Sequence, residues 1–305
     1  MGRGLWGNRE VPLYQAMLQD ILITGLISGG VYALLAVGFS LIFGVARIVN
    51  IAHTAFYMLA AYCFYTLLVV AKLDVIVAGL IAIVAVTALS VICYKFLIEP
   101  VREHPSAVLI ATIALATIFQ ELMQVSFGGN YLGIPSTIDG VVSVGGVTIP
   151  YQRMLIVVVA AIMLAITWWL LYRTRLGLAI RATANDREVA TLMGMNAERV
   201  AMASVAISVA LAAIAGVVVA PVFVVDPRMW LAPLVTMLAI VVLGGLGSLK
   251  GSLIGAFIIG YVEAITVYAI PSGSYLKGAV ALTIMIVVLL VRPEGLLGVA
   301  FEEER

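Results

Sequence analysis

The chain has 305 residues, of which 64% are hydrophobic and 11% are charged, and its formal net charge is +1. A typical soluble domain carries about 25% charged residues. This composition therefore excludes a fully water-soluble surface and predicts that lipid covers much of the outside. Cys63 and Cys93 lie in separate apolar runs and form no CxxC pair, so we expect no disulfide framework.

Long apolar segments recur along the chain, and about 20 such residues cross the roughly 30 Å hydrocarbon core of a bilayer. The candidate spans are 21–44, 51–71, 74–96, 106–126, 154–172, 200–223, 232–247, 252–270 and 277–291. The runs are continuous rather than alternating, which argues against a transmembrane β-barrel. We therefore predict an all-α polytopic membrane protein, one domain over 1–305 with eight or nine transmembrane helices. Segments 232–247 and 277–291 are short enough for partial or re-entrant helices.

The loop charges orient these spans, because short cytoplasmic loops are rich in Lys and Arg. Alternating spans place on one side Arg47, Lys95, Arg102, Arg173, Arg175, Arg181, Arg187, Arg199, Lys250, Arg292 and Arg305. The other side receives only Lys72, Arg153, Arg228 and Lys277. The first side is thus predicted to be cytoplasmic, although Arg3 and Arg9 then lie outside, against the rule. Trp168, Trp169 and Tyr172 precede Arg173, as expected of an aromatic belt at the cytoplasmic interface.

Two long loops separate the spans. The external loop, 127–153, contains "GVVSVGGVTI" around Gly145 and Gly146, a pattern typical of a β-hairpin. The cytoplasmic loop, 173–199, contains the charged stretch "ATANDREVATLMGMN".

A short helix is predicted at 185–195. Its apolar residues fall at i, i+3 and i+4 and would share one face: Val189, Leu192 and Met193. Asp186 and Glu188 suit the positive end of a helix dipole, and Gly194 can end the helix in a left-handed conformation. The pattern fits an amphipathic helix lying on the membrane, or a docking helix whose apolar residues enter a groove on a soluble partner.

Polar side chains within spans are costly and so are candidates for function. As candidate residues of a substrate pathway we select Asn50, His53, Gln120, Glu121 and Glu263. Each also has a structural interpretation: His53 as a hydrogen-bonded core residue, Gln120 and Glu121 as polar contacts between helices. Glu263 is either a paired carboxyl that fixes helix packing or a polar wall of the pathway.

The chain has no site of its own for nucleotide hydrolysis. A phosphate-binding P-loop needs GxxxxGK[ST], and the nearest candidate, "GGLGSLKGS", has Leu249 where the second Gly is required. Gly247, Gly251 and Gly255 instead suggest close helix approach. His53 and His104 are isolated in the sequence, so we expect no catalytic residues, metal or cofactor in this chain. Energy must come from a separate ATPase or an ion gradient.

Five segments together carry a family resemblance. They are "GGVYALLAVGFSLIFG" (29–44), "NIAHTAFYMLAAY" (50–62), "RTRLGLAIRATANDREVATLMGMNAERV" (173–200), "VVLGGLGSLKGSLIGAFIIGYVEA" (241–264) and "RPEGLLG" (292–298). In these segments the chain resembles the LivH-type permeases, membrane subunits of branched-chain amino acid ABC importers. The resemblance implies transport of branched-chain or related amino acids across a prokaryotic cytoplasmic (inner) membrane by a multi-pass protein.

The resemblance also implies partners and residues. The loop 173–199 would be the coupling loop that seats on an ATPase, with Ala184, Asp186, Ala190, Gly194 and Asn196 matching the family pattern. The implied partners are a second permease, two cytosolic ABC ATPases that hold ATP and Mg, and an extracytoplasmic solute-binding protein. Membrane lipid is expected as a further partner and nucleic acid is not. The chain departs from the family at Thr54, where Gly is usual, and at Thr236, where many members have Lys.

Three alternatives stay open. A urea or short-amide permease of the same family would share all these features. An ion-coupled secondary carrier would use Glu121 or Glu263 to bind the driving proton, and carriers of this kind often contain repeats and broken helices. A structural membrane anchor would need no polar residues in its spans.

Overall fold

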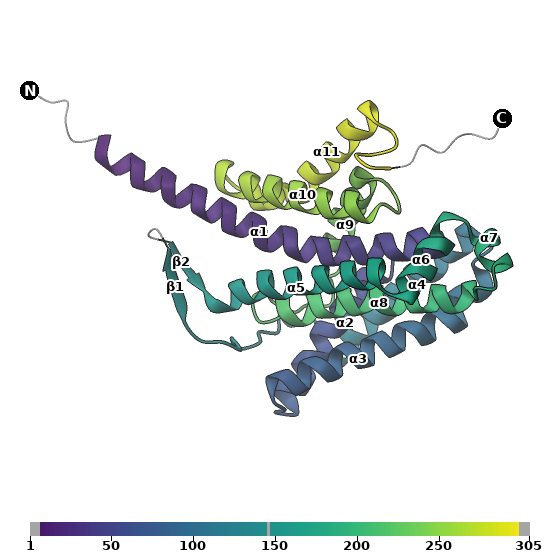
Figure 1. Ribbon diagram of the computed structural model, residues 1–305. Helices are drawn as coiled ribbons and strands as arrows, with labels where there is room; N and C mark the ends of the chain where they lie inside the picture. The colour runs from purple at the N-terminus through teal and green to yellow at the C-terminus, as the bar shows by residue number, and fades with distance from the viewer. Residues whose placement is uncertain (1–6, 145–146, 299–305) are drawn as a thin grey trace, which may run out of the picture.

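The computed structural model describes residues 7–144 and 147–298. Within this part of the chain, eight helices are long and apolar enough to cross a membrane, which confirms the predicted all-α polytopic fold. Figure 1 shows the long helices running side by side, with a strand pair at one end and two short helices at the other. Arg3, Arg305 and the turn at Gly145 and Gly146 lie outside the described residues.

The helices of membrane length are α1 (Gly7–Ala46), α2 (His53–Tyr65), α3 (Val75–Cys93), α4 (Pro105–Phe127), α5 (Tyr151–Arg173), α8 (Ala197–Val219), α10 (Leu249–Ala269) and α11 (Lys277–Val291). Further turns lengthen α2 to Val70, α3 to Val101, and α11 backwards to Gly273. The shorter helices are α6 (Arg175–Asn185), α7 (Arg187–Leu192) and α9 (Leu231–Gly244).

Two helices differ in length from the apolar segments that predicted them. Helix α1 has 40 residues, about 60 Å at 1.5 Å per residue, and begins at Gly7 rather than at residue 21. Helix α9 has 14 residues, about 21 Å, so it is too short to cross the roughly 30 Å hydrocarbon core alone. The segment 232–247 is thus a partial crossing.

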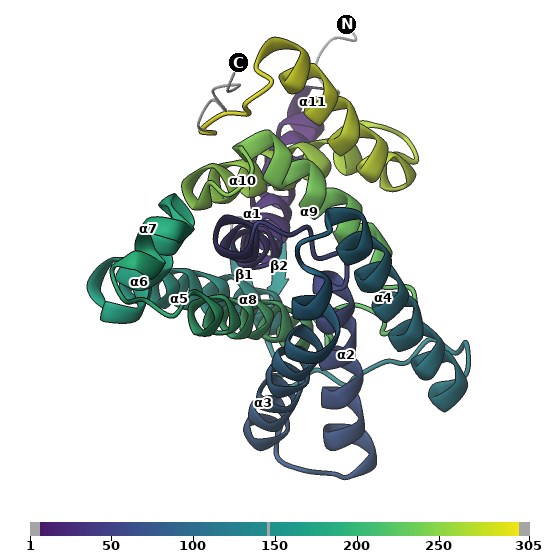
Figure 2. The ribbon, with the colours of Figure 1, turned by 90° about the vertical axis from the view of Figure 1, so that its right-hand side faces the viewer.

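Helix α1 lies at the centre of the molecule. Figure 2 shows α5 and α8 on one side of it and α9 and α10 on the other. At the crossing of α1 and α10, a Cβ added to Gly260 would lie 2.6 Å from the backbone nitrogen of Gly29. The absence of a side chain therefore lets the two backbones touch.

Small residues also join α9 to α10. A Cβ on Gly251 would lie 1.9 Å from the carbonyl oxygen of Gly244, and one on Gly255 would lie 3.0 Å from that of Ile240. These two contacts confirm the predicted close helix approach. Gly247 has another role: it lies in the turn before α10 with a φ of 81°, in the left-handed region that favours glycine.

The outer end carries the predicted hairpin. Strands β1 (Val141–Val144) and β2 (Val147–Pro150) pair antiparallel, with Val144 opposite Val147 and Val141 opposite Pro150. An isolated bridge pairs Leu132 of the same loop with Val225, in the segment between α8 and α9.

The other end gathers the loops predicted to be cytoplasmic. The C-terminal segment returns to the end of α9, where the backbone nitrogens of Leu296 and Leu297 donate to the carbonyl oxygens of Leu243 and Gly244. Helices α6 and α7 lie at this same end (Figure 1).

Candidate functional site

The predicted coupling loop, 173–199, folds as two helices rather than one. Thr174 begins α6, because its Oγ1 accepts a hydrogen bond of 3.0 Å from the backbone nitrogen of Gly177. Gly177 packs so closely that an added Cβ would lie 2.2 Å from the carbonyl oxygen of Leu170. Helix α6 was not predicted from the sequence, although Thr174 is a typical N-cap residue and could have indicated it.

Helix α7 follows directly, and its ends are fixed by residues that the family resemblance singled out. Asp186 Oδ1 accepts from the backbone nitrogen of Val189 at 2.9 Å, which caps the helix at its start. Gly194 ends it with a φ of 86°, as predicted. Asn196 Oδ1 then accepts from the backbone nitrogen of Arg199 at 3.0 Å and caps α8. Asp186, Gly194 and Asn196 therefore set the backbone path of the loop.

The side chains of α7 and of Met193, which follows its last residue, divide into an inner and an outer set. Ala190 is 3% exposed, whereas Val189 is 53%, Leu192 86% and Met193 76% exposed. We call Val189, Leu192 and Met193 the apolar triad. The triad is presented outward at the end of the molecule, on a short loop that is otherwise rich in charge. Exposed apolar groups of this kind commonly mark an interaction site.

A basic cleft lies beside the apolar triad. Arg187 of α7 and Arg102, from the connection between α3 and α4, line a cavity of about 530 Å³ together with Thr191 and Glu198. Burial, and then the nearby charge of Arg102, lowers the pKa of Arg187, since both disfavour its cationic form. The nearby charge of Glu99 acts in the opposite direction on this pKa, and Glu198 is the one acidic residue among the described residues that line this arginine cleft, so the two cations leave room for a further anionic group. This cleft was not predicted, because residues 102 and 187 are far apart in the chain.

Two of the five predicted pathway residues lie together at the start of α2. His53 is fully buried, with its Nε2 3.2 Å from the carbonyl oxygen of Leu35 and its Nδ1 3.5 Å from Ser208 Oγ. Asn50 is 1% exposed, and its Oδ1 has no hydrogen-bond partner among the described residues. The Oγ1 of Thr54, one of the departures from the family pattern, has none there either.

Glu263 lies in a different place, between α1, α9 and α10. It is 2% exposed. The Tyr32 hydroxyl donates to its Oε2 at 2.8 Å, and Thr236 Oγ1 donates to its Oε1 at 3.2 Å. The second departure from the family pattern, Thr236, thus supplies a polar partner for the buried carboxyl. These contacts favour the interpretation of Glu263 as a residue that fixes helix packing.

The remaining two pathway residues form a third group on α4. Gln120 Oε1 accepts from Trp230 Nε1 at 3.0 Å, and its Nε2 donates to Glu121 Oε1 at 3.2 Å. Glu121 itself is exposed. The five residues are therefore distributed over three separate groups. Within 7–144 and 147–298, no cluster of three or more His, Cys, Asp or Glu residues could hold a metal ion.

Comparisons with known proteins agree with this architecture. A family model described as "Branched-chain amino acid transport system / permease component" matches residues 21–289. The permease protein BraD of a high-affinity branched-chain amino acid transport system in Pseudomonas aeruginosa is 31% identical over 91% of this chain and 94% of its own length. LivH of Escherichia coli K12, with the same description, is 31% identical over the same shares. A probable LivH of Methanocaldococcus jannaschii is 27% identical over 93% of each chain.

A solved structure supports the fold. PsaBC from Streptococcus pneumoniae, determined in complex with a Fab, superposes with a TM-score of 0.50 and 17% sequence identity, over 91% of this chain and 92% of the other. At this identity the likeness concerns the fold alone.

Proposed function

We infer the function from one premise: this chain belongs to the family of branched-chain amino acid transport system permease components. It is a multi-pass membrane permease, the membrane-spanning subunit of an ABC importer. We propose that its cargo is a branched-chain or related amino acid, that it lies in a prokaryotic cytoplasmic membrane, and that ATP and Mg bind to separate subunits.

The exposed apolar triad on α7 is the observation that supports the coupling mechanism. A helix with caps at both ends and a buried Ala190 is held in one orientation. Such a helix can seat its exposed side chains in a groove of a cytosolic ATPase. When the two ATPases close on ATP, α7 moves with them and displaces α6 and α8, to which the loop connects it.

The arginine cleft gives the ATPase a second point of contact. Arg102 and Arg187 share a cavity next to the triad, and a carboxylate there would form charge-assisted hydrogen bonds with both guanidinium groups. The proposed partner surface is therefore an apolar groove with an acidic rim. Arg102 would also transmit the motion of the ATPase to the connection between α3 and α4.

The remaining partners follow from the family. We propose a second permease subunit beside this chain, two cytosolic ABC ATPases, and an extracytoplasmic solute-binding protein that docks on the external loop 127–153. Recognition of the solute would lie mainly in the binding protein, which is consistent with the scattered polar residues of the spans. A urea or short-amide cargo remains the alternative within the same family.

An ion-coupled carrier has less support. Both carboxylate oxygens of Glu263 already accept hydrogen bonds, from Tyr32 and Thr236. A proton carrier needs instead a carboxyl that exchanges its proton with water during the cycle. Glu121 is exposed and accepts a hydrogen bond from its neighbour Gln120.

The test is uptake by proteoliposomes that contain this chain with the permease, ATPase and binding-protein products of its neighbouring genes. Labelled leucine, urea and acetamide are supplied outside, with ATP inside. We expect leucine uptake that requires ATP and the binding protein. Uptake driven by a proton gradient without ATP would contradict the importer mechanism, and uptake of urea in place of leucine would contradict the cargo.

A further inference from the structure

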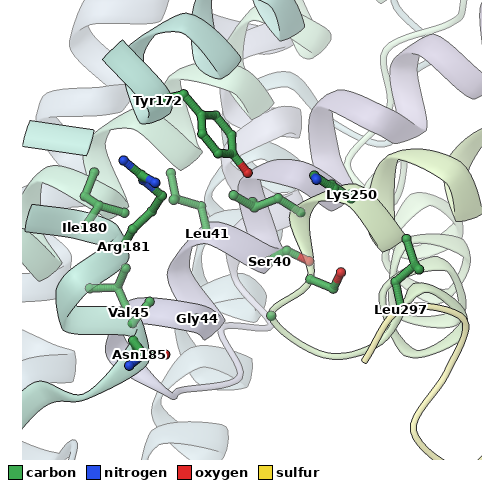
Figure 3. Close-up of a pocket in the computed structure, with 14 residues that line it drawn as sticks. Ser40, Leu41, Gly44, Val45, Tyr172, Ile180, Arg181, Asn185, Lys250 and Leu297 are labelled. Carbon is green, nitrogen blue, oxygen red and sulfur yellow. The ribbon is translucent and has the colours of Figure 1, made fainter. Parts of the chain in front are cut away.

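A second cavity at the cytoplasmic end is separate from the arginine cleft. It has a volume of about 490 Å³ and lies between the end of α1, α6 and the start of α10. Figure 3 shows Arg181 and Lys250 approaching it from opposite sides of Tyr172. Arg181 comes from α6 and Lys250 from the first turn of α10.

The cavity is basic. Its 14 lining residues include Arg181 and Lys250 and, among these described residues, no Asp or Glu. Asn185 and Ser248 add polar groups to the same wall. Two cations without a carboxylate create a positive potential that favours an anion.

Aromatic side chains fix both cations at the end of α5. The Arg181 guanidinium carbon lies 4.9 Å from the ring centroid of Tyr172, and Lys250 Nζ lies 5.8 Å from that of Trp168. The two rings pack with their centroids 4.4 Å apart. Arg181 Nε also donates to the carbonyl oxygen of Leu171 at 3.1 Å. The cationic heads are thus positioned by contacts that leave other N–H groups available.

The same aromatic cluster indicates the depth of the cavity in the membrane. Trp168 and Trp169 are 43% and 61% exposed, on a helix that carries Arg173 at its cytoplasmic end. Exposed Trp and Tyr side chains at the end of a transmembrane helix lie at the level of the lipid headgroups. A headgroup in the cytoplasmic leaflet therefore has direct access to Arg181 and Lys250.

We propose that this cavity binds the phosphate of an anionic phospholipid from the cytoplasmic leaflet, with Arg181 and Lys250 as the charged ligands. Basic pockets between transmembrane helices on the cytoplasmic side suit such headgroups. A lipid is favoured over an acidic protein segment because the cations rest on aromatic rings that face the bilayer. The bound lipid would contact α6, the helix that leads into α7. Lipid binding at this place rests on the proposed membrane orientation of the chain and is independent of the transported solute.

The test measures lipid binding to the full chain by native mass spectrometry in detergent. The probes are phosphatidylglycerol, phosphatidylcholine of the same acyl chains, and inorganic phosphate. We expect tighter binding of phosphatidylglycerol than of the other two. In the double variant Arg181→Gln/Lys250→Gln this affinity should fall about thirtyfold, which corresponds to about 1 kcal/mol for each cation.

Matched control variants distinguish a loss of this site from a general loss of positive charge and from misfolding. Arg173→Gln/Arg175→Gln removes two exposed charges from the same loop, outside the cavity lining, and should retain the affinity. Lys250→Arg keeps the charge and should also retain the affinity for phosphatidylglycerol. Lys250→Gln alone should lower this affinity about fivefold. Equal losses in both double variants, or no preference for phosphatidylglycerol over phosphatidylcholine, would overturn the proposal.

Two further outcomes would also overturn it. If inorganic phosphate binds as tightly as the lipid, the cavity is a site for soluble anions. If the Arg181→Gln/Lys250→Gln chain still binds phosphatidylglycerol but no longer copurifies with the ATPase, the cavity is a protein contact. Because lipid binding itself is measured on this chain without ATP or partners, failure of that measurement leaves the transport proposal untouched.

Discussion

The hydroxyl of Tyr32 donates a hydrogen bond of 2.8 Å to the buried carboxylate of Glu263 and so joins α1 to α10. Thr236 of α9 donates to the other oxygen of the same carboxylate. One side chain thus connects three helices at the point where the backbones of α1 and α10 also approach closely.

This arrangement predicts that Glu263→Gln keeps the fold and most of the uptake, because the amide oxygen can still accept from Tyr32. Glu263→Leu should lower stability by about 1–3 kcal/mol, since it leaves buried hydroxyl groups without an acceptor. Thermal unfolding of the purified chain and leucine uptake measure the two effects. A proton carrier would behave differently: Glu263→Gln would abolish transport while stability stayed high.

Substitution in the apolar triad should release the ATPase. Leu192→Asp places a charge on a side chain that is 86% exposed, so the chain itself should fold normally. If Leu192 is buried in the partner, we expect a loss of at least about 2 kcal/mol in binding, as for a central interface residue. Copurification and a titration with the ATPase provide the measurement.

The control for this experiment is Leu178→Asp on α6, where the side chain is 56% exposed. It should leave ATPase binding unchanged. A different result would show that α7 lies on the membrane. In that case both variants would weaken the contact of the loop with the vesicle surface and would leave ATPase binding unchanged.

Gly194 should tolerate Asn better than Val. Its φ of 86° is costly for residues with side chains and most costly for β-branched ones, while no heavy atom lies within 4 Å of an added Cβ. Gly194→Val should therefore distort the end of α7 at a cost of about 1–3 kcal/mol and reduce ATP-driven uptake. Membrane insertion should be normal in both variants, so equal uptake by the Asn and Val forms would exclude the predicted role of this turn.

The arginine cleft should make ATPase binding sensitive to salt. Arg102→Gln and Arg187→Gln should each weaken binding at low ionic strength and flatten its salt dependence, because added salt screens the attraction between exposed charges and shortens the Debye length to about 10 Å at 0.1 M. Titrations at several salt concentrations measure this slope. Arg173→Gln, at the end of α5 and outside the cleft, serves as the control and should keep the slope of the parent chain.

Helix packing gives a prediction that is independent of transport. Gly260→Ala would force a Cβ to 2.6 Å from the backbone of Gly29, and overpacking of this kind costs about 1–3 kcal/mol. Gly278→Ala is the matched control in α11, where an added Cβ meets nothing within 4 Å. Thermal unfolding should show a lower unfolding temperature for Gly260→Ala than for Gly278→Ala. Equal unfolding temperatures would mean that the α1–α10 contact is looser than in this structure.

Local chemistry explains how much of the fold could be predicted from the sequence. Apolar segments indicated the long helices. The spacing of Val189, Leu192 and Met193, with Asp186 near the start and Gly194 at the end, indicated a short capped helix that the structure confirms. The hairpin was predicted from alternating residues around two glycines and was also confirmed. Each of these features depends on neighbours within a few positions in the chain.

The contacts of the candidate site depend on distant residues and could not be predicted in this way. Nothing in the sequence near Glu263 indicates that Tyr32 and Thr236 donate to it. The pairing of Arg102 with Arg187 likewise requires the end of α3 and the start of α7 to meet. The five predicted pathway residues were selected for polarity alone, and polarity does not determine which of them share a cavity.

The external loop is joined by backbone hydrogen bonds to the segment that precedes α9. Leu132 and Val225 exchange two backbone hydrogen bonds, and the segment that holds Val225 leads into α9, the helix that crosses only part of the bilayer. Trp230, just before α9, contacts Gln120 inside α4. A displacement of Leu132 would therefore be transmitted through the backbone to Val225 and the start of α9, and through Trp230 to the middle of α4.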